Sequence, residues 1–502
     1  MRSSIIISSF VLFVGVFLGK ISGFTRELFV AWTFGTNSEA DLTIILLMLP
    51  DLIVHILAGG SISAVLIPEF KSMNEVDSFN LYMQSFIVAL ILSCLLSSGL
   101  AIHSKYLLKL AAPGFGPELL LRGSELLKIV IWMIPLTVLS VVNVAYLNSK
   151  HSFFVASLGV SIFNVTLIAG FILLDSQDKL FLSDLAKFVI LGAFLRFVSQ
   201  LVLIIRKIKS FEIHLNLLLN VTILYRYLNS VGLYGFIILI PVTLRAISSL
   251  GDPGTLASFN YTIKLIELPL SLYISTLSVV MLPVMSELFN SADKQLHIKA
   301  NNQIKIYLLL ICIISLIVSS LIYLLKYNII NLVLSSSLIP QSELIRIGEA
   351  LGVGIYSLPL QGVSAVLTTV YISKKNSKTP LLINLFGVII NAVSGYFLYS
   401  YFGIKGLMIS LSITFLFITV VQFLTIYHYY KLKLWDLLFN INFFKNIVFS
   451  VIILWIFKIL NQTFEIGSVE SICYGVVSGI IILTINLFIN SDIRNYMNEF
   501  KI

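Results

Sequence analysis

Apolar stretches long enough to cross a lipid bilayer recur along almost the whole of this chain. The hydrocarbon core of a bilayer offers no water to the peptide backbone, so stretches of this kind must fold as helices there. About fourteen such windows can be distinguished, at 5–33, 42–66, 81–102, 126–147, 152–174, 183–205, 222–249, 257–285, 304–325, 343–371, 380–399, 404–428, 445–461 and 469–489. The sequence therefore predicts an all-α polytopic membrane protein with about 14 transmembrane helices.

The composition leaves little of the chain for any other kind of domain. Only 11% of the 502 residues are charged, against roughly 25% in soluble domains, and the mean hydropathy is +1.00. The breaks between the apolar windows are no longer than about 25 residues. The three cysteines, at 94, 312 and 473, have neither disulfide nor metal-binding spacing. These features argue against a water-soluble enzyme, and we expect no metal and no cofactor.

Lysines and arginines outside the apolar windows are distributed unevenly between alternate loops. One set of loops, taken together with both chain ends, carries 15 of them, and the other set carries 6. The positive-inside rule then places both termini in the cytoplasm, which an even number of spans also requires. Most of the formal net charge of +9 is explained by this cytoplasmic belt. We therefore expect no nucleic-acid partner.

The two halves of the chain share short motifs in the same order, at an offset of about 220 residues. The stretches 133–136 and 146–150 correspond to 357–360 and 371–375, and Asn164 corresponds to Asn391. The offset spans six predicted helices, an even number, so both copies keep one membrane orientation, as in transporters built from parallel repeats. This predicts two six-helix lobes related by a parallel repeat, at 1–218 and 219–430, followed by two C-terminal helices at 431–502.

Three cations lie deep inside apolar windows and mark a candidate binding site: Lys20, Arg26 and Lys264. A charged side chain at mid-membrane costs roughly 2.5–3.5 kcal/mol, so each must face water or a partner. Lys20 and Glu27 are seven residues apart and share a helix face, whereas Arg26 is expected to point elsewhere. A phosphate-bearing substrate would supply the anion that three buried cations need. We take these three residues as the candidate substrate-binding cations.

Other polar side chains recur at helical spacing in equivalent helices of the two halves. An aqueous cavity between two lobes would have walls of this kind. The residues that we expect to line or support such a cavity are Asp41, Asp51, His55, Asn260, Glu267 and Ser271. The first helix also carries a glycine at every fourth position, which predicts close packing or bending. The candidate hinge or packing glycines are Gly19, Gly23 and Gly60.

Each of these assignments has a purely structural alternative. Stripes of serine and threonine also mark helix packing, and Lys264 with Glu267 could form only a structural ion pair. Arg245, Glu343 and Arg346 can be read as interfacial residues whose charged ends reach the headgroups. His55 is either a proton carrier or a hydrogen-bonded packing residue.

Several short motifs occur in order along most of the chain. They are Gly23-Phe24-Thr25-Arg26-Glu27, Ala40-Asp41, Leu49-Pro50-Asp51, the stretch 58–68, the stretch 261–270 and Gly403-Ile404-Lys405-Gly406-Leu407. Together they resemble the MurJ/MviN family, which comprises lipid II flippases of the multidrug/oligosaccharidyl-lipid/polysaccharide exporter (MOP) superfamily. The resemblance covers about residues 1–430, and the last two helices match in number more than in motif.

The resemblance implies two lobes around a cationic cavity, with the last two helices forming a groove for a polyprenyl tail. It places Arg26 on a cavity arginine of the family, and Lys20 and Lys264 where the family usually has arginine. Asp41 and Glu267 match family carboxylates.

The chain also departs from the family pattern. Where the family has an asparagine followed by two arginines, this chain has Asp51 and then His55, and the stretch 58–60 lacks the family's glutamate. Some members bind sodium through aspartates of the seventh and eleventh helices. This chain has no acidic residue in either span, only Asn384 and Asn391 in the eleventh. A sodium site is therefore not expected.

The leading hypothesis is a lipid-linked saccharide flippase, not an enzyme, that translocates lipid II across the bacterial inner membrane by alternating access. Its expected partners are an undecaprenyl-diphosphate-linked saccharide and membrane lipid, cell-wall synthesis proteins are left open, and a monomer is expected. One alternative is a flippase for another undecaprenyl-diphosphate-linked surface polysaccharide. A drug/cation antiporter of the same superfamily would need unpaired acidic residues in its cavity. A glycosyltransferase or polymerase would need longer loops than this chain has.

Overall fold

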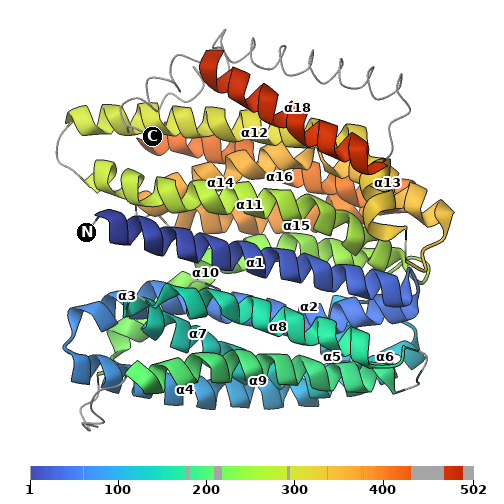
Figure 1. The fold of residues 1–502 in the computed structure, drawn as a ribbon, viewed down its shortest axis with the longest axis horizontal. Coiled ribbons are helices and arrows are strands. Elements are labelled where there is room, and N and C mark those ends of the chain that lie inside the picture. The colour runs from blue at the N-terminus through green and yellow to red at the C-terminus, as the bar shows by residue number, and fades with distance from the viewer. Residues whose placement is uncertain are drawn as a thin grey trace. The chain divides into compact units, whose positions relative to one another are not determined.

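The computed structural model is helical throughout its ordered elements and contains no strand in the part of the chain that it describes (Figure 1). It describes residues 2–59, 61–150, 152–176, 178, 180–207, 218–290, 294–335, 337–374, 376, 378–430 and 468–489. The chain divides into two compact units, Met1–Asn260 (unit 1) and Tyr261–Ile502 (unit 2). The predicted lobe boundaries after residues 218 and 430 remain a prediction.

Unit 1 contains ten helices within its described residues and the beginning of an eleventh. Their bounds are α1 Arg2–Phe34, α2 Ser38–Ala58, α3 Ser61–Ser72, α4 Glu75–Ile102, α5 Ser104–Ala111, α6 Pro117–Val130, α7 Met133–Ser149, α8 Phe153–Leu173, α9 Phe181–Lys207, α10 Val221–Ser248 and α11 Thr255–Asn290. Within this unit α8 packs between α1 and α9, and α7 packs against α9, α4, α3 and α2. Helix α10 packs against α2, α3 and α5.

Unit 2 contains the rest of α11 and six further helices within its described residues. They are α12 Lys294–Leu334, α13 Gln341–Gly354, α14 Ser357–Ser373, α15 Lys378–Phe402, α16 Ile404–Tyr430 and α18 Ser468–Ile489. Helix α16 packs against α13, α14 and α15, while α12 packs against α13, α14 and α18.

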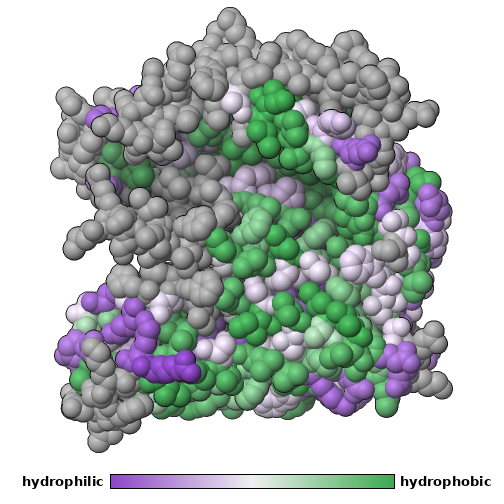
Figure 2. Space-filling view, in the orientation of Figure 1, coloured by the Kyte–Doolittle hydropathy of each residue, from purple (hydrophilic) through white to green (hydrophobic). Residues whose placement is uncertain are grey.

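Seven helical segments among the described residues are long and apolar enough to cross a membrane, and the pair α13 and α14 makes an eighth. A multi-span helical protein is thus confirmed, and the count of fourteen remains a prediction. Each apolar window within the described residues is wholly or largely helical, whereas the window 445–461 lies outside them. Figure 2 shows hydrophobic side chains over the middle of the described helices and hydrophilic ones near their ends, as a membrane protein requires.

Two of the apolar windows are divided into two helices at a proline. The break between α6 and α7 precedes Pro135, and the break between α13 and α14, where the axis bends by 44°, precedes Pro359. Proline has no amide hydrogen to donate to the carbonyl four residues earlier, so a continuous helix is interrupted there. Sequence periodicity alone does not reveal these breaks, because the residues on both sides are equally apolar.

Several helices are capped by an asparagine at the amino end or by a glycine at the carboxyl end. Asn37 and Asn74 accept hydrogen bonds from the first-turn amides of α2 and α4, at 2.9 and 2.8 Å. Helix α1 ends at Gly35, whose φ of 64° is a left-handed conformation that glycine adopts readily.

Glycines on α1 bring its backbone close to α8. A Cβ atom at Gly19 would lie 3.4 Å from the Cβ of Val160, and one at Gly23 would lie 3.4 Å from the Nδ2 of Asn164. Both glycines therefore lie in close-packed positions. The candidate glycine at position 60 lies outside the described residues.

This packing predicts the effect of a larger side chain at Gly23. Replacement of Gly23 by valine places methyl groups against Asn164, and we expect it to lower the free energy of unfolding by roughly 1–3 kcal/mol and to reduce transport. Gly99 on α4 is the matched control, because no atom lies within 4 Å of a Cβ built there. Thermal unfolding of the two purified variants, Gly23→Val and Gly99→Val, measures the difference. Equal unfolding temperatures would contradict the close-packing interpretation.

Candidate functional site

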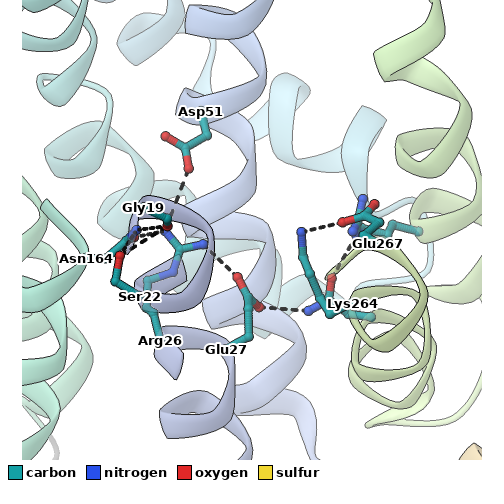
Figure 3. A network of polar contacts seen from close by, with 10 residues as sticks. Gly19, Ser22, Arg26, Glu27, Asp51, Asn164, Lys264 and Glu267 are labelled. Atoms are coloured by element: carbon teal, nitrogen blue, oxygen red, sulfur yellow. Dashed lines mark hydrogen bonds and ion pairs between the residues drawn. The ribbon is translucent and has the colours of Figure 1, made fainter. Parts of the chain in front are cut away.

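The candidate site of unit 1 centres on Arg26, in the C-terminal half of α1 (Figure 3). Its Nη2 donates to Glu27 Oε1 at 2.6 Å, and its Nη1 donates to Asn164 Oδ1 of α8 at 3.3 Å. The carboxylate of Asp51 on α2 lies 3.8 Å from Nη1. The Nε of Arg26 is buried and has no hydrogen-bond partner among the described residues. The guanidinium thus has two carboxylates near it and still has one unused donor.

Asn164 holds the other side of this arginine in place. Its side-chain amide donates to the Gly19 carbonyl at 3.4 Å and to the Ser22 hydroxyl at 3.3 Å, so its oxygen is turned toward Arg26. Figure 3 shows this group of residues gathered where α1 faces α8. The close approach of the two helices at Gly19 and Gly23 is what allows the short asparagine side chain to reach across.

Glu27 continues the polar network toward α11 and α10. It is buried, with 7% of its surface exposed, and its Oε2 accepts a hydrogen bond from Asn260 Nδ2 at 2.9 Å. The Oδ1 of Asn260 in turn accepts from the Nε of Arg245 at 2.9 Å. Asn260 therefore bridges a carboxylate and a second arginine within unit 1.

Two expectations about these charges are corrected by the structure. Arg245 was expected at the membrane interface, but it is buried, with 4% of its surface exposed, and hydrogen-bonded to Asn260. Arg26 was expected to point away from the face that carries Glu27, yet the two adjacent side chains form an ion pair. The long arginine side chain bends around the helix to reach the carboxylate. A helical wheel gives only the direction in which a side chain leaves the helix, so it does not predict this contact.

Asp41 has a different environment from the one expected of a cavity residue. It is buried, and its two oxygens accept hydrogen bonds from the backbone amides of Gly254 and Ala257, both at 2.7 Å. Gly254 has a φ of 88°, and a Cβ there would overlap the Thr36 carbonyl. Asp41 of α2 therefore caps the amino end of α11.

The remaining candidates lie in several environments. Lys20 and His55 are exposed at the surface of the chain, and the side chain of Asp51 is 35% exposed. In unit 2, Lys264 donates to Glu267 Oε2 at 2.8 Å, with both side chains about one-third exposed. The hydroxyl of Ser271 donates to the Leu268 carbonyl of its own helix at 2.9 Å.

Sequence reasoning overlooked the roles of Asn164 and Arg245. Asn164 was noticed only as a mark of the internal repeat, although an asparagine inside an apolar helix signals a hydrogen-bonded partner. Arg245 lies near the end of its apolar window, where an interfacial position is the ordinary expectation. Arg245 is buried because the fold places Asn260 beside it, and the spacing of residues along one helix cannot predict that contact.

The arrangement is suited to binding an anion without covalent chemistry. Arg26 is held by carboxylates that an incoming phosphate group could replace, and its unused Nε offers a further donor. Within the described part of the chain, no group of three or more His, Cys, Asp or Glu residues is placed to hold a metal ion.

Comparison with known proteins relates the chain to one family. The family model described as lipid II flippase MurJ matches residues 30–475. A probable lipid II flippase MurJ of Borreliella burgdorferi is 22% identical over 450 residues, covering 86% of this chain and 86% of that protein. The corresponding protein of Rickettsia prowazekii is 25% identical over 400 residues, covering 75% of this chain and 74% of the relative.

Solved structures show the same fold. A structure of lipid II flippase MurJ in an inward closed conformation matches with a TM-score of 0.79 at 18% identity, covering 98% of this chain and 100% of that one. An inward-facing multidrug resistance MATE family transporter of the MOP superfamily matches with a TM-score of 0.66 at 14% identity, covering 86% of this chain and 96% of the transporter.

Proposed function

The chain belongs to the lipid II flippase MurJ family, and on this basis we propose that it moves lipid II across the bacterial inner membrane. The substrate combines a polyprenyl tail, a diphosphate and a sugar-peptide head. The tail remains in lipid while the diphosphate and the head pass through a polar pathway. No covalent step is required, so the protein acts as a transporter and not as an enzyme.

The observation that carries the proposal is the environment of Arg26. A buried guanidinium with two nearby carboxylates and one unused donor can exchange a carboxylate for a phosphate oxygen. Guanidinium and phosphate match in geometry as well as in charge. We propose that Lys20 and Lys264 join Arg26 in holding the diphosphate, with Asp51, His55, Glu267 and Ser271 along the same pathway and Asn260 and Asp41 supporting it.

The affinity for the substrate stays moderate if its phosphate replaces a carboxylate that already pairs with Arg26, and transport needs a moderate affinity. Such a substrate gains only the difference in free energy between the arginine–phosphate and the arginine–carboxylate interactions. Loading and release are then both accessible as the protein alternates between inward and outward openings. A membrane potential that is positive outside would favour release of the anionic head there.

The test of this function is depletion of the protein in its own bacterium. We expect lipid II to accumulate in the inner leaflet and the cells to lyse, and expression of the wild-type chain to restore both. Leaflet position can be measured by the accessibility of lipid II to a reagent that does not cross the membrane. Normal peptidoglycan together with loss of one surface polymer would refute lipid II as the substrate and indicate another lipid-linked saccharide.

We further propose fourteen spans with both termini in the cytoplasm, two six-helix lobes at 1–218 and 219–430, and a groove for the lipid tail formed by 431–502. The excess of cations in one set of alternate loops supports this topology. Fusion of a fluorescent protein that folds only in the cytoplasm to either end should give fluorescent cells, and fusion after Lys105 should not. Fluorescence from the fusion at Lys105 would contradict the topology. A monomer, with cell-wall synthesis proteins as neighbours, fits the same proposal.

A further inference from the structure

Lys326 lies near one end of the membrane-spanning part of α12, and the candidate site described above does not use it. The stretch 306–325, between Lys305 and Lys326, contains no charged residue. Its roughly 20 residues span about 30 Å at the rise of an α-helix, which is the thickness of the hydrocarbon core of a bilayer. We therefore expect the charge of Lys326 to lie where the hydrocarbon core ends and the lipid headgroups begin.

The side chain of Lys326 lies between two aromatic rings and a glycine. Its Nζ is 4.9 Å from the centre of the Tyr323 ring and 5.0 Å from that of the Tyr327 ring. A Cβ atom at Gly352 of α13 would lie 2.9 Å from the same Nζ, and one at Gly348 would lie 2.7 Å from Tyr327 Cε1. Helix α13, which packs against α12 near its carboxyl end (Figure 1), thus leaves room for both side chains.

Lys326 has no anionic partner in the part of the chain that the structure describes. No hydrogen bond or ion pair joins it to another residue there. The two carboxylates of α13 bind other cations. Glu343 Oε1 lies 3.2 Å from Arg346 Nη1. Glu349 Oε2 lies 2.6 Å from Lys405 Nζ. Aromatic rings attract the ammonium group but leave its N–H donors without an oxygen acceptor, so an anion from outside the chain would complete its environment.

The tyrosines around Lys326 are exposed. Tyr323, Tyr327 and Tyr356 have 43%, 42% and 60% of their surface exposed, and the rings of Tyr323 and Tyr356 are 5.9 Å apart. Tyrosine is enriched at the level of the lipid headgroups, because its ring is apolar and its hydroxyl is polar. Lys326 and these three tyrosines, called the Lys326 cluster below, therefore combine a cation with the type of aromatic residue that prefers this level of a membrane.

Unit 1 contains a second lysine–tyrosine pair at the corresponding place. The dipeptide Lys105-Tyr106 precedes its counterpart at 326–327 by about 220 residues, the offset of the internal repeat. Both residues are exposed and lie in the first turn of α5, directly after the long apolar helix α4. Lys105, too, has no ion pair within the described residues. A feature that recurs near the carboxyl end of a long apolar helix in both halves fits contact with the surrounding lipid, which both halves share.

We propose that the Lys326 cluster binds the headgroup of an anionic membrane phospholipid. The ammonium group of Lys326 donates hydrogen bonds to the phosphate oxygens, and the tyrosine rings contact the glycerol and the first part of the acyl chains. Charge complementarity selects this occupant, because a phospholipid of net negative charge is the anion that a membrane presents at this depth. The inference concerns a bound lipid and not the transported molecule, so it does not depend on the proposed function.

The test is protection of lysine amines in the purified full-length chain in detergent. An amine-acylating reagent is added, and mass spectrometry gives the rate of acylation at each lysine. Phosphatidylglycerol should slow acylation of Lys326 by about fivefold. Lys405, a lysine of the same unit whose amine is already paired with Glu349, is the internal control and should react equally fast with and without the lipid. Phosphatidylcholine, which has no net charge, should protect Lys326 less.

Two variants test the role of the charge, with native mass spectrometry of the chain titrated with phosphatidylglycerol as the measurement. Lys326→Gln should bind the lipid about fivefold more weakly, whereas Lys326→Arg, which keeps the charge, should bind it as the wild type does. Lys405→Gln is the matched control and should leave binding unchanged. Equal protection of Lys326 and Lys405, equal protection of Lys326 by the two lipids, or unchanged binding by Lys326→Gln would overturn the inference.

Discussion

Replacement of Arg26 by glutamine is expected to reduce lipid II translocation by about 100-fold or more. The change removes the cation from the centre of the site and leaves Glu27 and Asp51 without their shared partner. Truncation of one member of a buried, hydrogen-bonded charge pair costs roughly 2–5 kcal/mol, and 1.4 kcal/mol corresponds to tenfold. Translocation can be measured in proteoliposomes or by complementation of the depleted strain, with the amount of protein in the membrane determined in parallel.

Two further variants test whether the loss of translocation comes from the missing guanidinium of Arg26. Arg26→Lys keeps the charge without the planar guanidinium, and we expect it to retain part of the activity. Lys128→Gln removes a cation from an exposed ion pair with Glu125, where both side chains are about half exposed, and should have little effect. Full transport by Arg26→Gln at normal expression would show that the diphosphate is held elsewhere.

Replacement of Asp41 by alanine should produce the largest loss of stability. Its carboxylate accepts two backbone hydrogen bonds at 2.7 Å, and without it the amides of Gly254 and Ala257 stay buried and unpaired. Each unsatisfied buried donor costs roughly 1–3 kcal/mol, so the expected loss is about 2–6 kcal/mol. Thermal unfolding in detergent and the yield of intact protein both report it.

Asn37→Ala is the matched comparison, because Asn37 also caps a helix but is exposed and accepts a single amide bond. A loss of about 1 kcal/mol is expected for such a cap. Asp41→Asn keeps one acceptor oxygen, so its loss of stability should lie between those of Asp41→Ala and Asn37→Ala. If Asp41→Ala unfolded at the wild-type temperature but lost transport, Asp41 would act on the substrate and not as a cap.

The sequence predicted the helices and the family, but it did not predict which charged residues form ion pairs and hydrogen bonds with one another. Apolar stretches of spanning length predicted a multi-span helical protein because the bilayer permits little else, and the motifs around Arg26 predicted the family correctly. The divisions of spans at Pro135 and Pro359 were not predicted, since proline in a long apolar segment either bends a helix or begins a new one, and packing decides which.

In the candidate site, too, the sequence indicated a functional residue but not the residues that contact it. Arg26 was selected because a cation in an apolar helix is costly, and that argument needs no partner. Its partner Asn164, and Asn260, which is the partner of the neighbouring Glu27, lie more than 130 residues away in sequence, so only tertiary packing brings them near.

The start of α11, together with Gly254 just before it, is bonded to two other helices: to α2 through Asp41, and to α1 through the bond between Asn260 and Glu27. Two separate attachments restrict the movement of this segment relative to α1 and α2. We therefore expect a reorientation of α11 during a transport cycle to arise by bending further along the helix. Pro269 lies two and a half turns beyond Asn260 and has no amide hydrogen to bond the carbonyl four residues earlier, so we expect α11 to bend there.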